Sequence, residues 1–319
     1  MNTTLALYAN YSVYSAIAVL TLAMLAYAAY LARAIPARDA VRAPERVLVG
    51  AGAPADAPVG DGVDERAAGV EAGRKFALLG RNFAWLATLL LGLGMILRAL
   101  AVHRPPLGNL YEFVCAAAFA TLLAFCVWSL RRDVSWLGIF IVTPALLLLL
   151  LAIKAFYTEA SSLMPALRSY WLSIHVSMAI ISVGVFTLGA AVAGLYLLLD
   201  RFERAGRTPR WARALPSAGE LERMSYSLHI VAFPLWTFTV IAGAIWARQA
   251  WASYWNWDPK EVWSFIIWVV YAAYLHARAT TGVTRQKANW IALAGFACVI
   301  VNFTVVNLYF VGQHSYSGM

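Results

Sequence analysis

Eight apolar stretches, each long enough to cross a bilayer, dominate this chain of 319 residues. A membrane-spanning helix needs about 20 such residues. Hydrophobic residues make up 62% of the chain and the mean hydropathy is +0.67, which excludes a soluble globular domain. The sequence therefore predicts an all-α, polytopic membrane helix bundle of eight transmembrane helices. The predicted spans are 11–33, 82–102, 111–130, 134–154, 171–199, 225–246, 263–281 and 290–311.

The positive charges are distributed unevenly between the two sets of loops. The alternate loops 34–81, 131–133, 200–224 and 282–289 hold seventeen Lys and Arg residues, whereas the opposite loops and both termini hold four. Because Lys and Arg accumulate in cytoplasmic loops, both termini are predicted to lie outside. The net charge of +9 thus reports membrane orientation rather than binding to nucleic acid.

Composition divides the chain into three parts. Residues 1–34 predict the first transmembrane helix and not a signal peptide, because the positive charges follow the apolar run. Residues 35–81 are rich in Ala, Pro, Gly, Asp and Arg without apolar periodicity, which predicts a disordered basic cytoplasmic linker. Residues 82–319 form the membrane domain, with an external loop at 247–263. None of the three cysteines belongs to a Cys-x-x-Cys pair, so neither a disulfide framework nor a thiol redox motif is expected.

Tryptophans gather around this loop. Six of the thirteen in the chain fall within 23 residues: Trp246, Trp251, Trp255, Trp257, Trp263 and Trp268. Indole rings favour membrane interfaces, so an aromatic belt is one interpretation. Belts are spread over many helices, however, and this cluster is local. It predicts a flat apolar surface that covers a large planar ligand.

The polar residues inside the cluster have two interpretations. Asp258 can be the N-cap of the seventh helix, with Pro259 at its first position, and Glu261 can complete a capping box. These residues then only begin the helix. Asp258 is also a candidate ligand-binding residue, because it adjoins the indole surface.

Two histidines are predicted at the external face. His314 follows Trp290 by 24 residues, a rise of about 36 Å, and His175 precedes Asp200 by 25 residues, a similar distance. Both lengths exceed a hydrocarbon core of about 30 Å. Neutral imidazole is a strong axial ligand of haem iron, and two imidazoles complete a six-coordinate site. Interfacial histidines in contact with water are the alternative.

Two further histidines are predicted deep in the membrane. His276 lies about 27 Å below the outer face and His229 about 25 Å below it, both in the inner leaflet. An ionisable group inside a span is a functional hypothesis by default, although each histidine could simply bond between helices. His103, in an external loop, is expected to be incidental.

Taken together, these residues resemble the CcsA/ResC-type haem-handling subunits of the system II cytochrome c synthase, members of the WWD domain family. The resemblance covers most of 82–319. It rests on Pro-Leu-Gly-Asn-Leu-Tyr-Glu at 106–112, Ser-Ile-His-Val-Ser-Met around His175, the Trp-rich run 255–263, His276 and the terminal Gly-Gln-His-Ser-Tyr.

The resemblance implies the following roles. His175 and His314 would ligate haem iron on the external face, with Trp251, Trp255, Trp257, Trp263 and Asp258 as further haem-binding residues. His276 would be an intramembrane haem-iron ligand, and His229 is an added hypothesis for a second one. The ligand is haem b, iron protoporphyrin IX, which would be presented to apocytochrome c for thioether attachment at Cys-x-x-Cys-His. The implied partners are a ResB/CcsB-type membrane subunit, apocytochrome c and a thioredoxin-like thiol reductase, in the bacterial cytoplasmic (inner) membrane, with the active site on the periplasmic side.

Other functions remain open at this stage. A membrane b-type cytochrome would use the deep and external histidines to carry electrons. A haem transporter would move the cofactor without ligation chemistry. Within the family, a system I haem-handling protein is the nearest alternative, and the eight spans together with the spacing of His175 and His314 favour system II.

Overall fold

The computed structural model describes residues 2–42, 61–160 and 169–314. This part of the chain is helical and contains no strand. Eight of its segments are long and apolar enough to span a membrane, which confirms the predicted all-α polytopic bundle. The long helices are α1 (Thr3–Arg42), α2 (Asp61–Val102), α3 (Leu110–Ser129), α4 (Gly138–Ala155), α5 (Tyr170–Arg204), α6 (Ala218–Trp251), α7 (Pro259–Ala279) and α8 (Arg285–Phe303). Shorter elements are α9 (Val305–Tyr309) and the 3₁₀ turns η1 (Ser135–Leu137) and η3 (Arg210–Ala214).

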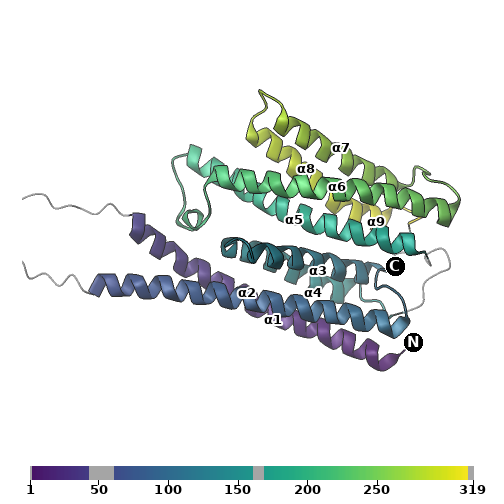
Figure 1. Cartoon of the computed structure of the whole chain (residues 1–319), viewed down its shortest axis with the longest axis horizontal. Coiled ribbons are helices and arrows are strands. Elements are labelled where there is room, and N and C mark those ends of the chain that lie inside the picture. Colours follow the sequence, from purple (N-terminus) through teal and green to yellow (C-terminus); the bar gives the residue numbers. More distant parts are fainter. Residues whose placement is uncertain (1, 43–60, 161–168, 315–319) are drawn as a thin grey trace, which may run out of the picture.

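The helices run side by side along one direction (Figure 1). Helices α1 and α2 pack together at one edge of the bundle, α3 and α4 follow, then α5 and α6, and α7 and α8 form the other edge. The N-terminus and the end of the chain lie at the same end of the bundle. This arrangement agrees with an even number of spans.

Helix α1 packs through a regular seam of small and aromatic residues. Seven of its buried positions alternate in steps of four and three: Ala9, Val13, Ala16, Leu20, Ala23, Tyr27 and Tyr30. This spacing keeps one face against a neighbour, as in left-handed helix pairs. Because lipid is as apolar as leucine, membrane helices associate through close packing, which small residues permit.

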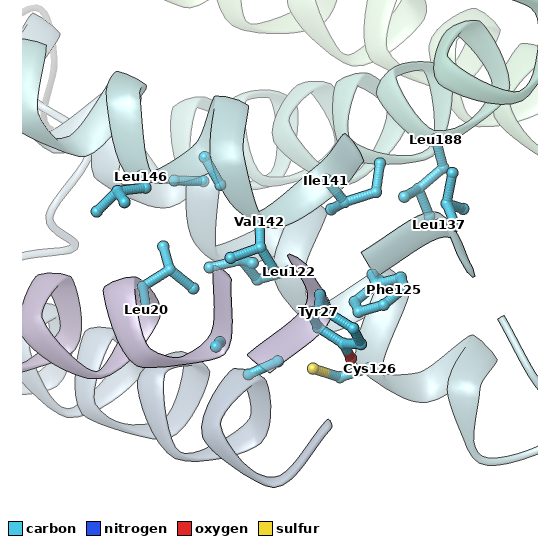
Figure 2. Packing of buried hydrophobic residues seen from close by; sticks show 14 of the residues in the cluster. Leu20, Tyr27, Leu122, Phe125, Cys126, Leu137, Ile141, Val142, Leu146 and Leu188 are labelled. Atoms are coloured by element: carbon cyan, nitrogen blue, oxygen red, sulfur yellow. The ribbon is translucent and has the colours of Figure 1, made fainter. Parts of the chain in front are cut away.

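Tyr27 occupies a space that two glycines leave open. A Cβ atom on Gly138 would lie 2.5 Å from the Tyr27 ring, and one on Gly80 would lie 3.0 Å from it. The ring packs edge-on against Phe125 with centroids 6.0 Å apart, beside Cys126 (Figure 2). Helices α1, α2 and α3 and the start of α4 therefore meet around a single aromatic side chain.

The predicted linker is shorter than the sequence suggests. Helix α1 continues to Arg42 and α2 begins at Asp61, so 35–42 and 61–81 are helical and the prediction of disorder is wrong there. The reason is that Ala, Arg and Glu are strong helix formers that need no apolar face to extend an existing span. Glu71 and Lys75 add an i,i+4 ion pair of 2.9 Å. Residues 43–60 lie outside the described residues.

Buried polar pairs connect the helices at the end opposite the termini. The carboxylate of Glu222 on α6 is fully buried and accepts two hydrogen bonds from Arg278 on α7, through Nε and, at 3.1 Å, through Nη2. Gln286 on α8 donates to Asp200 on α5. These contacts hold α5 to α8 in one unit, which carries most of the site.

The last span is not one continuous helix. Helix α8 ends at Phe303, Thr304 has φ −114° and ψ −78°, and α9 begins at Val305. The chain leaves helical geometry after Tyr309. The rise of about 36 Å to His314 therefore overstates the distance, because it assumes a helix throughout. The break also turns Asn307 of α9 towards Lys260 of α7.

Candidate functional site

A cavity opens at the end of the bundle where both termini lie. The space between its walls is about 1110 Å³ when the open solvent at its mouth is included. Its walls come from the start of α3, the first turns of α5 and α7, the second half of α6, the end of α8, and α9. The lining residues are Leu107, Gly108, Asn109, Leu110, Phe113, Leu172, His175, Val176, Ala179, Trp236, Thr239, Val240, Gly243, Ala244, Ala247, Tyr254, Trp255, Lys260, Glu261, Ser264, Asn302, Phe303, Asn307 and His314.

His175 enters the cavity from the second turn of α5. Its Nδ1 lies 2.9 Å from the carbonyl oxygen of Thr239 on α6. Since a carbonyl oxygen only accepts, Nδ1 carries the proton and Nε2 keeps a lone pair for a metal centre. The ring stacks on Trp246 at an interplanar angle of 14°. Gly243 makes the approach possible, because a Cβ there would lie 2.7 Å from the imidazole.

His314 reaches the same cavity from the end of the chain. Its Nδ1 lies 2.7 Å from Oδ2 of Asp258, and the backbone N–H of Gln313 donates to Oδ1 of the same carboxylate at 2.6 Å. The carboxylate thus fixes the orientation of the His314 ring through Nδ1. The ring packs edge-on against Trp246 and Trp251, with centroid distances of 5.8 and 4.9 Å. Trp246 therefore touches both imidazoles.

Asp258 begins a helix and also contacts a cavity histidine. It is the N-cap of α7, and a capping box with Glu261 is present, as predicted. It also holds His314 and the backbone of Gln313. Burial by itself raises the pKa of the Asp258 carboxyl, but the hydrogen bonds and charge of its partners, His314 foremost, lower it below its usual value. A carboxylate that orients a ligating histidine in this way is a common support of metal sites.

The tryptophans of the loop divide into two groups. Trp255 lines the cavity and Trp251 contacts His314. Trp257 has a left-handed backbone with φ 57° and is 76% exposed, and Trp263 is partly buried without lining the cavity. The loop therefore forms a wall of the cavity only in part. Glu261 holds the backbone of this loop in place, because its Oε2 accepts from the N–H groups of Asn256 and Asp258.

The turn that precedes α3 supplies the opposite wall. Fully buried Glu112 accepts from Nε of Arg98 at 2.7 Å, from Nη1 and Nη2 of Arg104 at 2.7 and 3.0 Å, and from the backbone N–H of Gly108 at 2.8 Å. Asn109 caps α3 by accepting from the N–H of Glu112. One carboxylate thus fixes the turn 105–109, of which 107–109 lines the cavity.

Comparison with known proteins identifies the family. A family model described as "Cytochrome C assembly protein" matches residues 107–314, more than half of the chain and every wall of the cavity. The chain belongs to this family.

Curated relatives agree. The "Cytochrome c biogenesis protein CcsA" of Prochlorococcus marinus (strain MIT 9303) is 34% identical over 261 residues, 72% of this chain and 81% of the relative. The CcsA protein of Chlamydomonas reinhardtii is 36% identical over 237 residues, 72% of this chain and 66% of the relative. The predicted CcsA-type resemblance is confirmed, and with it a role in cytochrome c biogenesis.

A solved structure shares the fold. "Cytochrome c Heme Lyase CcmF" superposes with a TM-score of 0.58 at 16% sequence identity, over 95% of this chain and 47% of that longer one. At this identity the likeness concerns the helical architecture alone.

His229 lies away from the cavity. It is fully buried in α6, its Nδ1 donates to the carbonyl oxygen of Ser225 at 2.7 Å, and its ring is enclosed by Phe186, Tyr271 and Tyr274. A Cβ on Gly189 would lie 2.7 Å from it. These contacts surround the imidazole with protein and leave no room for a porphyrin beside it.

His276 has the opposite environment. It lies in the last turn of α7 and its side chain is exposed, two residues and thus roughly 200° round the helix from buried Tyr274. The structure does not bring His276 and His229 together. His103 is exposed in the loop after α2, with φ 52°, and does not line the cavity.

Several cavity residues have no counterpart in the sequence-based prediction. Trp236, Thr239 and Gly243 line the cavity without a motif that marks them. Lys260 also lines it; it lies within the Trp-rich run 255–263, but the sequence-based prediction gave it no role. These residues belong to α6 and α7, and only the packing of these helices against α5 shows which of their faces point inward. Asn302 connects two helices, because its Nδ2 donates to Oγ of Ser264 on α7 at 3.3 Å.

Replacing Gly243 with Ala should displace His175. The new Cβ would approach the imidazole to 2.7 Å, a distance that forces the ring to move. We expect porphyrin iron bound by purified Gly243→Ala to show a changed Soret band and a weaker affinity. Gly194→Ala on α5 is the matched control, because its Cβ would have nothing within 4 Å. An unchanged spectrum in Gly243→Ala would contradict the placement of His175 as a ligand.

Proposed function

We propose that this chain is the haem-handling subunit of a cytochrome c synthase, which holds haem in the cavity and presents it to apocytochrome c. The substrate is haem b, and the acceptor is the Cys-x-x-Cys-His segment of the apoprotein. The described parts of the basic loops, 34–42, 61–81, 131–133, 200–224 and 282–289, lie towards the other end of the bundle from the cavity. The positive-inside rule therefore supports an external, periplasmic site in the bacterial cytoplasmic membrane.

One observation carries the proposal. The imidazoles of His175 and His314 enter the same apolar cavity, and each has its Nδ1 bound to an oxygen atom. Nε2 is therefore the ring nitrogen through which each would ligate iron. Axial ligation by two neutral imidazoles is a common way of holding haem iron, and the hydrogen bonds at Nδ1 set ring orientation and strengthen the ligands.

The residues around the histidines fit a substrate that must be held and then released. Trp236 and Trp255 line the cavity and offer apolar surface, while the mouth of the cavity leaves an edge of the porphyrin open to the apoprotein. In thioether formation each thiol S–H adds across a vinyl C=C bond, so no electrons are gained or lost overall. The protein contributes position and orientation to this step.

Partners follow from the proposed role. His276 is exposed on the outer surface of the bundle near the cytoplasmic end of α7, where a second subunit could supply a further ligand. We propose a ResB/CcsB-type membrane protein as this subunit, and a thioredoxin-like thiol reductase that keeps the apocytochrome thiols reduced. His229 is omitted from the proposed ligand set, because its surroundings are filled by α5 and α7 side chains.

The deciding experiment is spectroscopic. The full chain is purified in detergent, with and without its membrane partner, and reduced and oxidised haem spectra are recorded. We expect a six-coordinate, bis-histidine signal that His175→Ala and His314→Ala each abolish or convert to a five-coordinate form. Loss of c-type cytochromes in cells that carry the same variants should accompany the spectral change.

The alternative functions make different predictions. A membrane b-type cytochrome would keep its haem permanently and exchange electrons with quinone, and a simple transporter would bind haem without histidine ligation. If His175→Ala and His314→Ala leave both the spectra and cytochrome c maturation intact, the proposed site is wrong.

A further inference from the structure

We propose that Lys260 binds a carboxylate of the ligand in the cavity, and hence that the site recognises a porphyrin through a free propionate group. This inference deepens the proposed function and rests on it for the identity of the ligand. Lys260 is the second residue of α7 and lines both the main cavity and a smaller recess beside it, formed with Asp258, Asn307 and His314. Among the lining residues of the main cavity, within the described part of the chain, it is the one lysine or arginine.

The immediate contacts of the ammonium group are neutral. Nζ donates a hydrogen bond to Oδ1 of Asn307 and lies 5.3 Å from the centroid of the Phe303 ring. Both partners line the cavity themselves. An ammonium group has three donors, so two remain after the bond to Asn307. The cation is thus held in place by its neighbours without being neutralised.

The nearby carboxylates are committed to other groups. Asp258 accepts from His314, Gln313 and the backbone N–H of Lys260, and Glu261 accepts from two backbone N–H groups of the loop. In the described residues no carboxylate oxygen forms an ion pair with Lys260 within 4.0 Å, whereas Arg98, Arg104 and Arg278 all have such partners. A partly buried cation without a counter-ion is unfavourable. An anionic ligand relieves this cost.

The ligand chemistry follows from the shape and the charge together. The apolar walls favour a large, flat, apolar ligand, and the ammonium group of Lys260 favours a carboxylate at one edge of that ligand. The N-terminus of α7 adds a partial positive charge on the same side. A dicarboxylate porphyrin meets both requirements, whereas its dimethyl ester has the same body without the charge. The ester is therefore the discriminating probe.

Metal-free porphyrins separate this inference from the iron ligation. The full chain in detergent is titrated with protoporphyrin IX and with protoporphyrin IX dimethyl ester, and binding is followed by the quenching of Trp fluorescence. We expect the wild type to prefer the free acid, and Lys260→Met to weaken binding of the free acid by about tenfold or more, the range of a charge-assisted hydrogen bond. Binding of the ester should be unchanged in the same variant, which also shows that the cavity is intact. Lys260→Arg should retain the preference.

Lys287→Met is the matched control, because Lys287 is exposed in the first turn of α8 at the opposite end of the bundle. If the wild type binds both porphyrins equally, or if Lys260→Met weakens both by the same factor, the inference is wrong. If instead the iron-haem spectra do not respond to His175→Ala and His314→Ala while Lys260 still selects the free acid, the proposed ligation fails and the carboxylate site stands.

Discussion

Asp258→Asn should weaken haem binding by about 10- to 100-fold, the usual effect of removing a group that supports a metal-ligating histidine. Both carboxylate oxygens are in use: Oδ2 accepts from His314 and from the N–H of Lys260, and Oδ1 accepts from the N–H of Gln313. Asparagine has one acceptor oxygen, so its NH₂ group would face another donor. The helix should remain capped, because Asn is as good an N-cap as Asp.

The measurement is haem affinity of the purified chain, together with the far-UV circular dichroism of the variant. Asp133→Asn provides the control, since Asp133 is an exposed residue that accepts from the N–H of Ser135 in a loop at the other end of the bundle. Wild-type affinity in Asp258→Asn would mean that His314 needs no carboxylate partner, contrary to the role assigned to this bond.

The pKa of Asp258 adds a pH dependence to this prediction. The hydrogen bonds of Asp258 hold its pKa below the usual carboxyl value, which is about 3.9. The carboxylate therefore supports His314 fully at any pH above that value. This support is lost only as the pH falls through the lowered pKa. The affinity ratio of wild type to Asp258→Asn should therefore stay constant between about pH 5 and pH 8. A ratio that approaches one near pH 6 would show that Asp258 titrates there.

Glu112→Ala should reduce the stability of the protein by about 3–5 kcal/mol, the cost of leaving a buried ion pair without one partner. The side chains of Arg98 and Arg104 are 6% and 8% exposed, so the substitution leaves two buried guanidinium groups without their shared carboxylate. The turn 105–109 also loses the acceptor for the N–H of Gly108. We therefore expect both a lower melting temperature and weaker porphyrin binding.

Thermal unfolding in detergent and the porphyrin titration measure the two effects. Glu159→Ala is the control. It tests whether removing any acidic side chain at this end of the bundle has the same effect, because Glu159 is exposed and follows α4 there. Should Glu112→Ala melt at the wild-type temperature, the buried cluster would not hold the turn. Glu112→Gln should have a smaller effect, since an amide still accepts one hydrogen bond.

Local chemistry explains which parts of the site could be predicted. The capping box at Asp258 and Glu261 depends on residues three positions apart, and the sequence contains it completely. The placement of His175 and His314 at one end of the bundle follows from counting residues along helices. The sequence did not predict that α1 continues to Arg42 or that α2 begins at Asp61. These extensions have good helix propensity but no apolar face, so they show no hydrophobic periodicity.

Side-chain neighbours could not be predicted in the same way. The depth estimate placed His229 and His276 at the same height, but the structure buries the first among aromatic rings and exposes the second. The helical face on which each residue lies depends on how α6 and α7 rotate against α5. That rotation is a property of the packed bundle.

The amino-acid sequence alone determined the eight spans, the helix start at Asp258 and the family motifs, because each depends on local hydrophobicity or on short spacings. Only the tertiary structure decided that Asp258 also holds His314, that Gly243 admits His175, and that Lys260 faces the cavity without a carboxylate partner. These contacts join residues up to about 70 positions apart in the chain, and only the packing of α5, α6, α7 and the chain end brings them within hydrogen-bonding or van der Waals distance.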